Sequence, residues 1–247
     1  MPRSSPSGVS YQFGPGPMTP AVRAIIYTNI AAFLITSFAP DPTVRLLFGL
    51  LGLTPQAVVG RGWIWQIASY LFLHGGLMHI LFNMLMVWMF GVELERRWGT
   101  RAFTTYYFVT GVGAGLSVVL VSLLPFAATR ASYAAVTIGA SGAVYGLIMA
   151  WALVFPDRVL MFMMMFPLPM RVYALLMGAI AFYSALGASG STVSHFAHLG
   201  GLAVGYLYLK GPRGPRNLRL ELQYRMTKWR MERMRRKFDV HRGGRVH

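Results

Sequence analysis

A histidine and an asparagine interrupt one of the most apolar runs of the chain. His79 and Asn83 lie in the sequence Leu-Met-His-Ile-Leu-Phe-Asn at residues 77–83. Because they are four residues apart, their side chains share one face of a helix. Polar groups inside an apolar helix are costly and face other protein groups rather than lipid. They could form a hydrogen-bonded pair that joins two helices, or donate hydrogen bonds to a charge that develops during a reaction.

A serine flanked by small residues begins a second apolar run. In Gly139-Ala140-Ser141-Gly142 the small neighbours would let another backbone approach closely and leave the hydroxyl accessible. The 16 residues from Ser141 to Pro156 make about 24 Å of helix, which is shorter than a hydrocarbon core of about 30 Å. We therefore expect Ser141 to lie below the membrane surface, under a space that water can fill. Tight helix packing alone would also explain the small residues.

A third apolar run carries a possible partner for this serine. His198 is followed by Gly201 and Gly205, which form a small-residue face for close helix packing. If that face packs against the glycines near Ser141, His198 comes close to the serine hydroxyl. A hydrogen-bonded histidine can take the proton of serine, which is otherwise a weak nucleophile.

An acyl-transfer site also needs donors for the oxyanion of its tetrahedral intermediate. The backbone N–H of Ser141 and the side chains of His79 and Asn83 could supply them. A carboxylate for a triad is missing, because every acidic residue of the apolar body lies at or near the end of an expected span. The pattern therefore indicates a Ser-His dyad. These acidic residues are Asp41, Glu93, Glu95 and Asp157.

The same small-residue string occurs a second time. Ser189 lies in Gly187-Ala188-Ser189-Gly190, but Ser191 and Thr192 follow it and no apolar helix begins there. It is also only nine residues from His198, on adjoining chain. We therefore interpret Ser189 as part of a loop and prefer Ser141 as the nucleophile.

Composition requires that the elements holding these residues lie in a membrane. Of the 247 residues, 55% are hydrophobic and 12% are charged, whereas soluble domains carry about 25% charged residues. The absence of cysteine excludes disulfides, thiolate nucleophiles and cysteine-based zinc sites. We expect an all-α integral membrane protein with six transmembrane helices in residues 21–209. The six apolar stretches are residues 22–39, 76–95, 102–124, 139–156, 170–187 and 195–209.

The rest of the chain consists of a leader, a broken loop and a basic tail. Residues 1–20 are rich in Pro, Gly and Ser and predict a flexible leader without a signal peptide. Residues 40–75 are apolar but interrupted by Pro and Gly, which favours a structured loop partly in the outer leaflet. Basic residues concentrate in alternate connections, which predicts that both termini are cytoplasmic. These residues are Arg23, Arg96, Arg97, Arg101, Arg158 and Arg171, together with the tail.

The tail at residues 210–247 holds 13 Lys and Arg against 3 Asp and Glu, out of a net charge of +16 for the whole chain. Residues 217–238 could form an amphipathic helix on anionic lipid, or the tail could be solvated and simply fix the topology. Nucleic-acid binding is not expected of a tail anchored to a membrane.

Together, these motifs resemble the rhomboid family of intramembrane serine proteases over about residues 40–209. The family pattern His-x-x-x-Asn falls on the second helix, Gly-x-Ser-Gly on the fourth, with a tyrosine four residues after the serine, and Ala-His-x-x-Gly-x-x-x-Gly on the sixth. A Glu-x-Arg pattern follows the second helix. The matching residues are His79, Asn83, Glu95, Arg97, Gly139, Ser141, Tyr145, Ala197, His198, Gly201 and Gly205.

The resemblance implies hydrolysis of a peptide bond in or near the transmembrane segment of a single-pass or multi-pass membrane protein. Ser141 would be the nucleophile and His198 the general base and then acid, with Tyr145 stacked on its ring. His79 and Asn83 would line the oxyanion site. The fifth helix and residues 187–195 would gate access of substrate from the lipid. The family uses no cofactor and no metal, and six helices suit a bacterial inner membrane.

One departure and three alternatives qualify this interpretation. Many family members have Trp-Arg in the first loop, where this chain has Trp65-Gln66, and the missing donors leave the rigidity of the loop open. A metal or haem protein could use four of the histidines as ligands, but cysteine and central carboxylates are absent. A helix-binding relative without activity would lack the serine or the histidine. A transporter would show intramembrane charges or inverted repeats. The histidines in question are His74, His79, His195 and His198.

Overall fold

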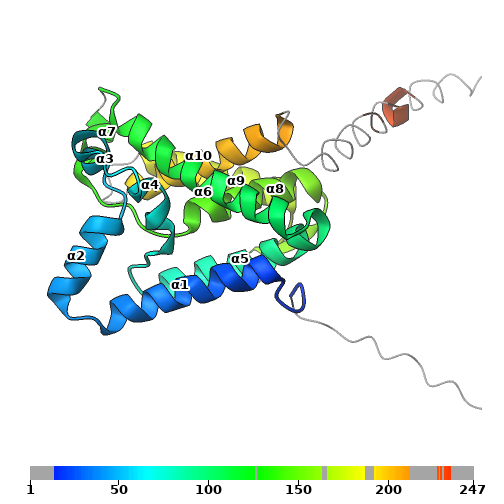
Figure 1. Ribbon diagram of the computed structural model, residues 1–247. Coiled ribbons are helices and arrows are strands. Elements are labelled where there is room, and N and C mark those ends of the chain that lie inside the picture. Colours follow the sequence, from blue (N-terminus) through cyan, green and yellow to red (C-terminus); the bar gives the residue numbers. More distant parts are fainter. Residues whose placement is uncertain are drawn as a thin grey trace, which may run out of the picture.

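The computed structural model describes residues 14–125, 127–162, 166–186, 192–211, 227, 229 and 231–234. Each of the six apolar stretches carries one helix in this part of the chain (Figure 1). Helices α1, α5 and α6 are long and apolar enough to cross a membrane, and α8 and α9 are shorter apolar helices. The six are α1 (Pro20–Phe38), α5 (Leu77–Trp98), α6 (Thr100–Ser122), α8 (Ser141–Val154), α9 (Met170–Leu186) and α10 (Thr192–Lys210).

Four shorter helices lie in the connections. The loop before α5 contains α2 (Asp41–Leu51), α3 (Pro55–Arg61), α4 (Gln66–Ser69) and a 3-10 turn (Tyr70–Phe72), and α7 (Ala127–Ala134) precedes α8. Prolines begin the helical turns of α2 and α3, where a missing N–H removes no hydrogen bond. In Figure 1, α2 leaves the end of α1 and stands apart from the bundle. The predicted structured loop is therefore largely helical.

Gln66 ties this loop together. Its side chain is fully buried, and Oε1 accepts a hydrogen bond from the backbone N–H of Thr54 at 3.0 Å. Nε2 donates to the carbonyl oxygens of Gly49 at 2.9 Å and Leu50 at 3.3 Å. Trp65 Nε1 also donates to the Leu50 oxygen, at 2.9 Å. The glutamine therefore provides both a donor and an acceptor where the family often has an arginine.

The connection between α8 and α9 is a β-hairpin, so the expectation of an all-α fold was wrong in this segment. Strands β1 (Val159–Phe162) and β2 (Phe166–Pro169) pair antiparallel. The segment is apolar without alternation, and such a short run does not distinguish a strand from part of a helix. The described part of the fold is thus mostly helical, with one two-stranded sheet.

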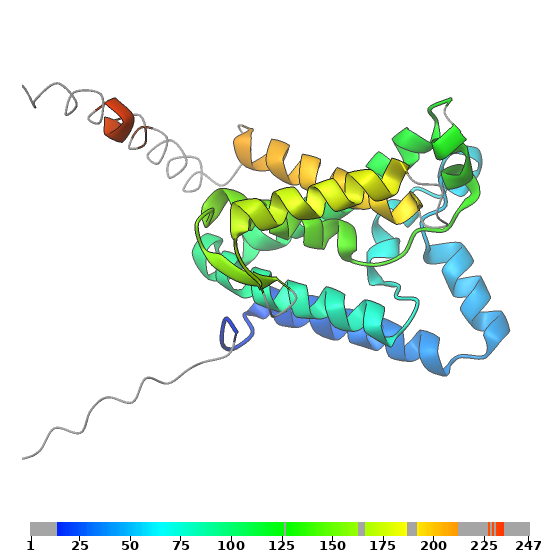
Figure 2. The same ribbon diagram turned by 180° about the vertical axis from the view of Figure 1, so that it is seen from behind.

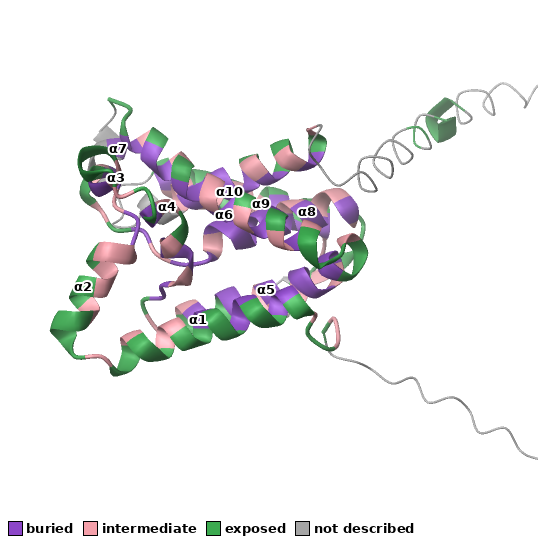
Figure 3. Cartoon of the chain, in the orientation of Figure 1, coloured by how far each residue is buried: buried purple, intermediate pink, exposed green. Residues whose placement is uncertain are grey.

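Close backbone contacts hold α10 between α6 and α8. A Cβ on Gly201 would collide with the carbonyl oxygen of Gly142, so α8 and α10 meet backbone to backbone. One turn further, Gly205 faces the backbone of Gly146, whose carbonyl accepts a hydrogen bond from Tyr106 Oη at 2.6 Å. Buried residues line the inner faces of the helices, whereas outward faces are exposed (Figure 3). This small-residue contact fixes how far apart the two helices lie.

A carboxylate joins α1 to the α5–α6 turn. Glu95 accepts hydrogen bonds from the backbone N–H groups of Ala21 at 2.9 Å and Val22 at 3.0 Å, and from Thr100 Oγ1 at 2.8 Å. The Thr19 hydroxyl also donates to it. These amides belong to the first turn of α1, where no intrahelical acceptor exists and negative charge is favoured. In the sequence Glu95 is only a motif residue at a span end, and in the structure it caps α1.

Candidate active site

The serine and histidine singled out in the sequence lie within hydrogen-bond distance. His198 Nε2 is 2.8 Å from Ser141 Oγ, although 57 residues separate them in the chain. Ser141 is the first residue of α8, and His198 lies in the second turn of α10. The approach of Gly201 to Gly142 one turn away brings the two helices close enough for this contact. A base that accepts a proton from a nucleophile needs this distance.

The position of Ser141 at a helix start has an electrostatic consequence. The first backbone N–H groups of a helix have no intrahelical acceptor, and the helix dipole favours negative charge there. Gly139, just before the helix, has φ +109°, which side-chain-bearing residues rarely adopt. Its N–H donates to the carbonyl oxygen of Tyr70 at 2.9 Å. A Cβ at Gly139 would lie 2.6 Å from His79 Nε2, so only glycine fits between His79 and the serine turn.

His79 and Asn83 lie on α5, and the His79 ring lies next to Gly139. The backbone N–H of Gly75 donates a long hydrogen bond of 3.4 Å to His79 Nδ1, so we assign the proton of the neutral ring to Nε2. That N–H is on the side of the ring next to Gly139. Asn83 is buried, and Nδ2 donates to the carbonyl oxygen of His79 at 2.9 Å. One amide proton of Asn83 thus stays on its own helix, and the other remains for a further acceptor.

Tyr145 packs flat against the base. Its ring and that of His198 are stacked, with centroids 4.1 Å apart and planes 5° apart. Tyr145 lies one turn after Ser141 on α8 and is itself buried. The stack restricts rotation of the imidazole and keeps Nε2 directed at the serine.

Two further histidines lie beside these rings. His74 is buried and meets the His79 ring edge-on at 5.0 Å, and neither of its ring nitrogens has a hydrogen-bond partner within the described part of the chain. His195 meets His198 edge-on at 5.9 Å. Among the described residues, no group of three or more His, Asp or Glu could hold a metal ion. Ser189, the rejected alternative nucleophile, lies outside the described residues.

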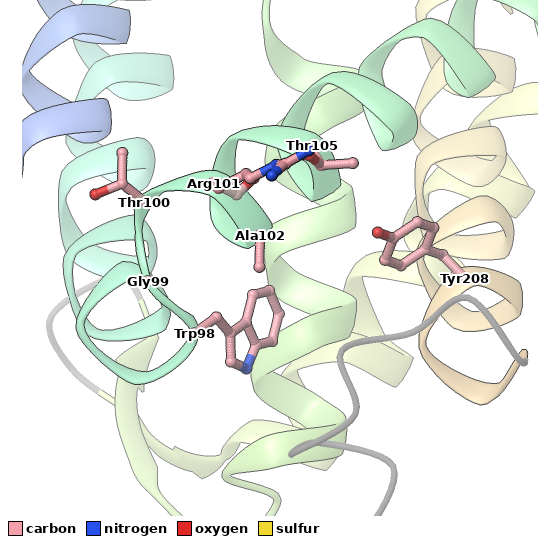
Figure 4. A pocket seen from close by; sticks show the side chains of 7 residues that line it. All are labelled: Trp98, Gly99, Thr100, Arg101, Ala102, Thr105 and Tyr208. Atoms are coloured by element: carbon pink, nitrogen blue, oxygen red, sulfur yellow. The ribbon is translucent and has the colours of Figure 1, made fainter.

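A hollow of about 500 Å³ lies elsewhere, at the opposite end of α10. Figure 4 shows Arg101, Trp98 and Tyr208 around it, at the α5–α6 turn and the last turn of α10. Tyr208 follows His198 by ten residues, which is about 15 Å along the helix axis. The hollow is therefore distinct from the serine-histidine pair.

The sequence is similar to one family model and to several known proteins. A family model described as Rhomboid domain matches residues 61–211. The chain is 34% identical over 107 residues to RHOMBOID-like protein 5 of Arabidopsis thaliana, covering 43% of this chain and 31% of that protein. It is 26% identical over 184 residues to Rhomboid-like protease 3 of Toxoplasma gondii, covering 74% and 64%. It is 30% identical over 144 residues to Rhomboid protease GlpG of Yersinia pseudotuberculosis, covering 58% and 46%.

The chain spans between 31% and 64% of the lengths of these three relatives. The family match, in contrast, covers more than half of this chain and includes all the motifs from His79 to Gly205. Both the arrangement of the helices and the sequence comparison agree with the resemblance noted in the motifs, and the chain belongs to the rhomboid family.

Proposed function

We propose that this protein is an intramembrane serine endopeptidase, which cleaves a peptide bond in or near the transmembrane segment of another membrane protein. The observation that carries the proposal is the 2.8 Å contact between His198 Nε2 and Ser141 Oγ at the start of a short apolar helix. Membership of the rhomboid family supports it, as do relatives named proteases in Toxoplasma gondii and Yersinia pseudotuberculosis.

In this mechanism, Ser141 Oγ attacks the substrate carbonyl while His198 Nε2 takes its proton. The tetrahedral oxyanion receives hydrogen bonds from the Ser141 N–H, His79 and Asn83. His198 then gives the proton to the leaving amine, and an acyl-enzyme remains on Ser141. A water molecule, deprotonated by His198, hydrolyses this ester and restores the serine. No metal or cofactor takes part.

The proposal also includes the membrane topology and the location of the protein. We propose that α1, α5, α6, α8, α9 and α10 all cross the membrane and that both termini lie in the cytoplasm, with a bacterial inner membrane as the location. The arginines of the α5–α6 turn and the α8–α9 connection support this orientation, because basic residues favour the cytoplasmic side. The basic tail, which lies mostly outside the described residues, would contact anionic lipid.

Cleavage of a transmembrane reporter tests the function. The wild type, Ser141→Ala and Ser189→Ala would be reconstituted in lipid vesicles with a single-span reporter, and the products identified by mass spectrometry. We expect cleavage at or near the span by the wild type and Ser189→Ala and none by Ser141→Ala. Equal cleavage by Ser141→Ala would contradict the proposal.

A further inference from the structure

The hairpin between α8 and α9 has an outer face without a polar side chain. Val159 pairs with Pro169 and Met161 with Pro167, and strand alternation places these four residues on one face. Val159 is 57% exposed and Met161 is 54% exposed. An antiparallel sheet with one face in water normally carries polar residues on that face. We call these four residues the outer face of the hairpin.

The opposite face of the sheet rests on the protein at Leu160, whereas Phe166 on the same face is 53% exposed. Leu160 packs against the hydrophobic core, and both strands contact α9. An ion pair between Arg158 and Glu93 joins the start of the hairpin to α5. In Figure 2 the strands lie along the side of the bundle between α9 and α5, rather than projecting beyond the ends of the helices. The outer face therefore points sideways, at the level of the helices.

The hairpin begins at the end of α8 that lies opposite Ser141. Helix α8 has 14 residues, or about 21 Å, which is less than the hydrocarbon core of about 30 Å. With Ser141 expected below one membrane surface, Val154 lies close to the other, and the charged Asp157 and Arg158 follow before β1 begins. The strands therefore begin at the charged end of the bundle and run back along its side (Figure 2).

The charges of this segment gather at its base. Arg171 Nη1 lies 3.2 Å from Asp157 Oδ1, and the guanidinium of Arg158 stacks over the rings of Trp151 and Phe155 at 5.2 Å and 5.0 Å. Arginines over aromatic rings are typical of the membrane–water interface, where the aliphatic stem lies in lipid and the charge reaches water. The start of the hairpin thus has the residues typical of the membrane–water interface, and the strands that run from it along the bundle are apolar.

We propose that the outer face of the hairpin is a lipid-binding surface, inserted between α5 and α9 into the leaflet at the arginine-rich end of the bundle. Its occupants are acyl chains. The surface is continuous with the lipid-facing side chains of the neighbouring helices, such as Leu175 of α9, which is 75% exposed. The proposal does not depend on the dyad, since an inactive protein would present the same face.

Site-specific fluorescence tests this directly because the chain has no cysteine. Single-cysteine variants would carry an environment-sensitive label in phosphatidylcholine vesicles, with and without lipids that bear a nitroxide on the acyl chain. Met161→Cys reports the outer face. Leu207→Cys, on the exposed side of α10, is the lipid reference, and Asp157→Cys, exposed at the base, is the aqueous reference.

We expect the Met161 label to show blue-shifted emission and to lose fluorescence to the nitroxide lipid as strongly as the Leu207 label, while the Asp157 label is barely affected. A Met161 label that emits as in water would overturn the proposal. A label with blue-shifted emission that the nitroxide lipid does not quench would also overturn it, because protein rather than lipid would then cover the face. Val159→Cys repeats the test on the same face, so that one misfolded variant does not decide it. Each variant is compared in thermal unfolding with the unlabelled protein.

Discussion

The two flanks of the bundle differ in what holds their helices together. Helices α8 and α10 meet backbone to backbone where Gly201 faces Gly142. Helices α5 and α9 meet through rings near one end, where Phe90 and Tyr173 lie 6.5 Å apart. Toward the other end, Leu77 at the start of α5 and Leu186 at the end of α9 are both exposed. The first contact leaves no space for a Cβ, and it is the one next to the serine and histidine.

We infer that the two flanks have different roles. Residues at the α8–α10 contact set the distance between nucleophile and base, where small displacements are costly. The α5–α9 flank is where we propose that a substrate helix reaches the site from the lipid, as the family resemblance implies. Substitutions should therefore be severe on the first flank and mild on the second, with the loop before α5 in between.

The largest effect is expected at Gly201. Its replacement by valine would force side-chain atoms into the carbonyl oxygen of Gly142 and push α8 away from α10. We expect a destabilisation of about 3 kcal/mol or more and loss of cleavage. Gly49→Ala is the control, since a Cβ there meets nothing within 4 Å. A Gly201→Val protein with normal thermal stability and activity would show that the close contact does not set the site.

Tyr145 should affect catalysis as well as stability, because its buried ring packs in the core and stacks on His198. Tyr145→Ala removes the ring stacked on His198, and the resulting freedom of the imidazole should lower kcat by about a hundredfold with little change in KM. Tyr145→Phe keeps the stack and should remain close to wild type. Steady-state kinetics on a reporter peptide distinguish the two. Equal losses in both variants would instead point to the hydroxyl group.

Gln66 should affect stability more than catalysis. Gln66→Ala leaves the partly buried Thr54 N–H and the Gly49 carbonyl oxygen without this partner, while the Leu50 oxygen keeps Trp65, at a cost of about 1–3 kcal/mol. Thermal unfolding in detergent measures this loss. Gln56→Ala, an exposed glutamine of the same loop, is the matched control and should unfold as the wild type does. No difference between the two variants would mean that other contacts hold the loop.

The smallest effect is expected on the outer side of α9. Leu175→Ala should change stability by no more than about 0.5 kcal/mol, because that side chain is 75% exposed. Leu147→Ala, fully buried on α8, should cost about 2–5 kcal/mol. Similar unfolding temperatures for both variants would remove the proposed difference between the flanks.

The sequence predicted the long elements and the residue types of the site. Hydropathy placed six helices to within a few residues of their observed ends, and the family prediction is confirmed by the domain match. The catalytic roles remain predictions, although the structure brings Ser141, His198 and Tyr145 together.

Other features depend on contacts that the sequence does not display. The hairpin was missed because its run of apolar residues lacks the alternation with polar residues that is typical of a strand. The hydrogen bonds of Gln66 were missed because their acceptors are carbonyl oxygens near the end of α2, which only the folded structure brings close. Glu95 was placed at a span end, but its capping of α1 depends on a residue pair 74 positions apart. The signal available in the sequence was a polar residue, Gln66, within an apolar loop.

Fluorophosphonate labelling of the purified protein tests the central claim most directly, since the probe reacts covalently with an activated serine. The wild type and the Ser189→Ala, Ser141→Ala and His198→Ala variants would be compared, with thermal unfolding to verify that each is folded. We predict labelling of the wild type and Ser189→Ala and its loss in the other two. Labelling that persists in Ser141→Ala, or that disappears only in Ser189→Ala, would contradict a dyad of Ser141 and His198.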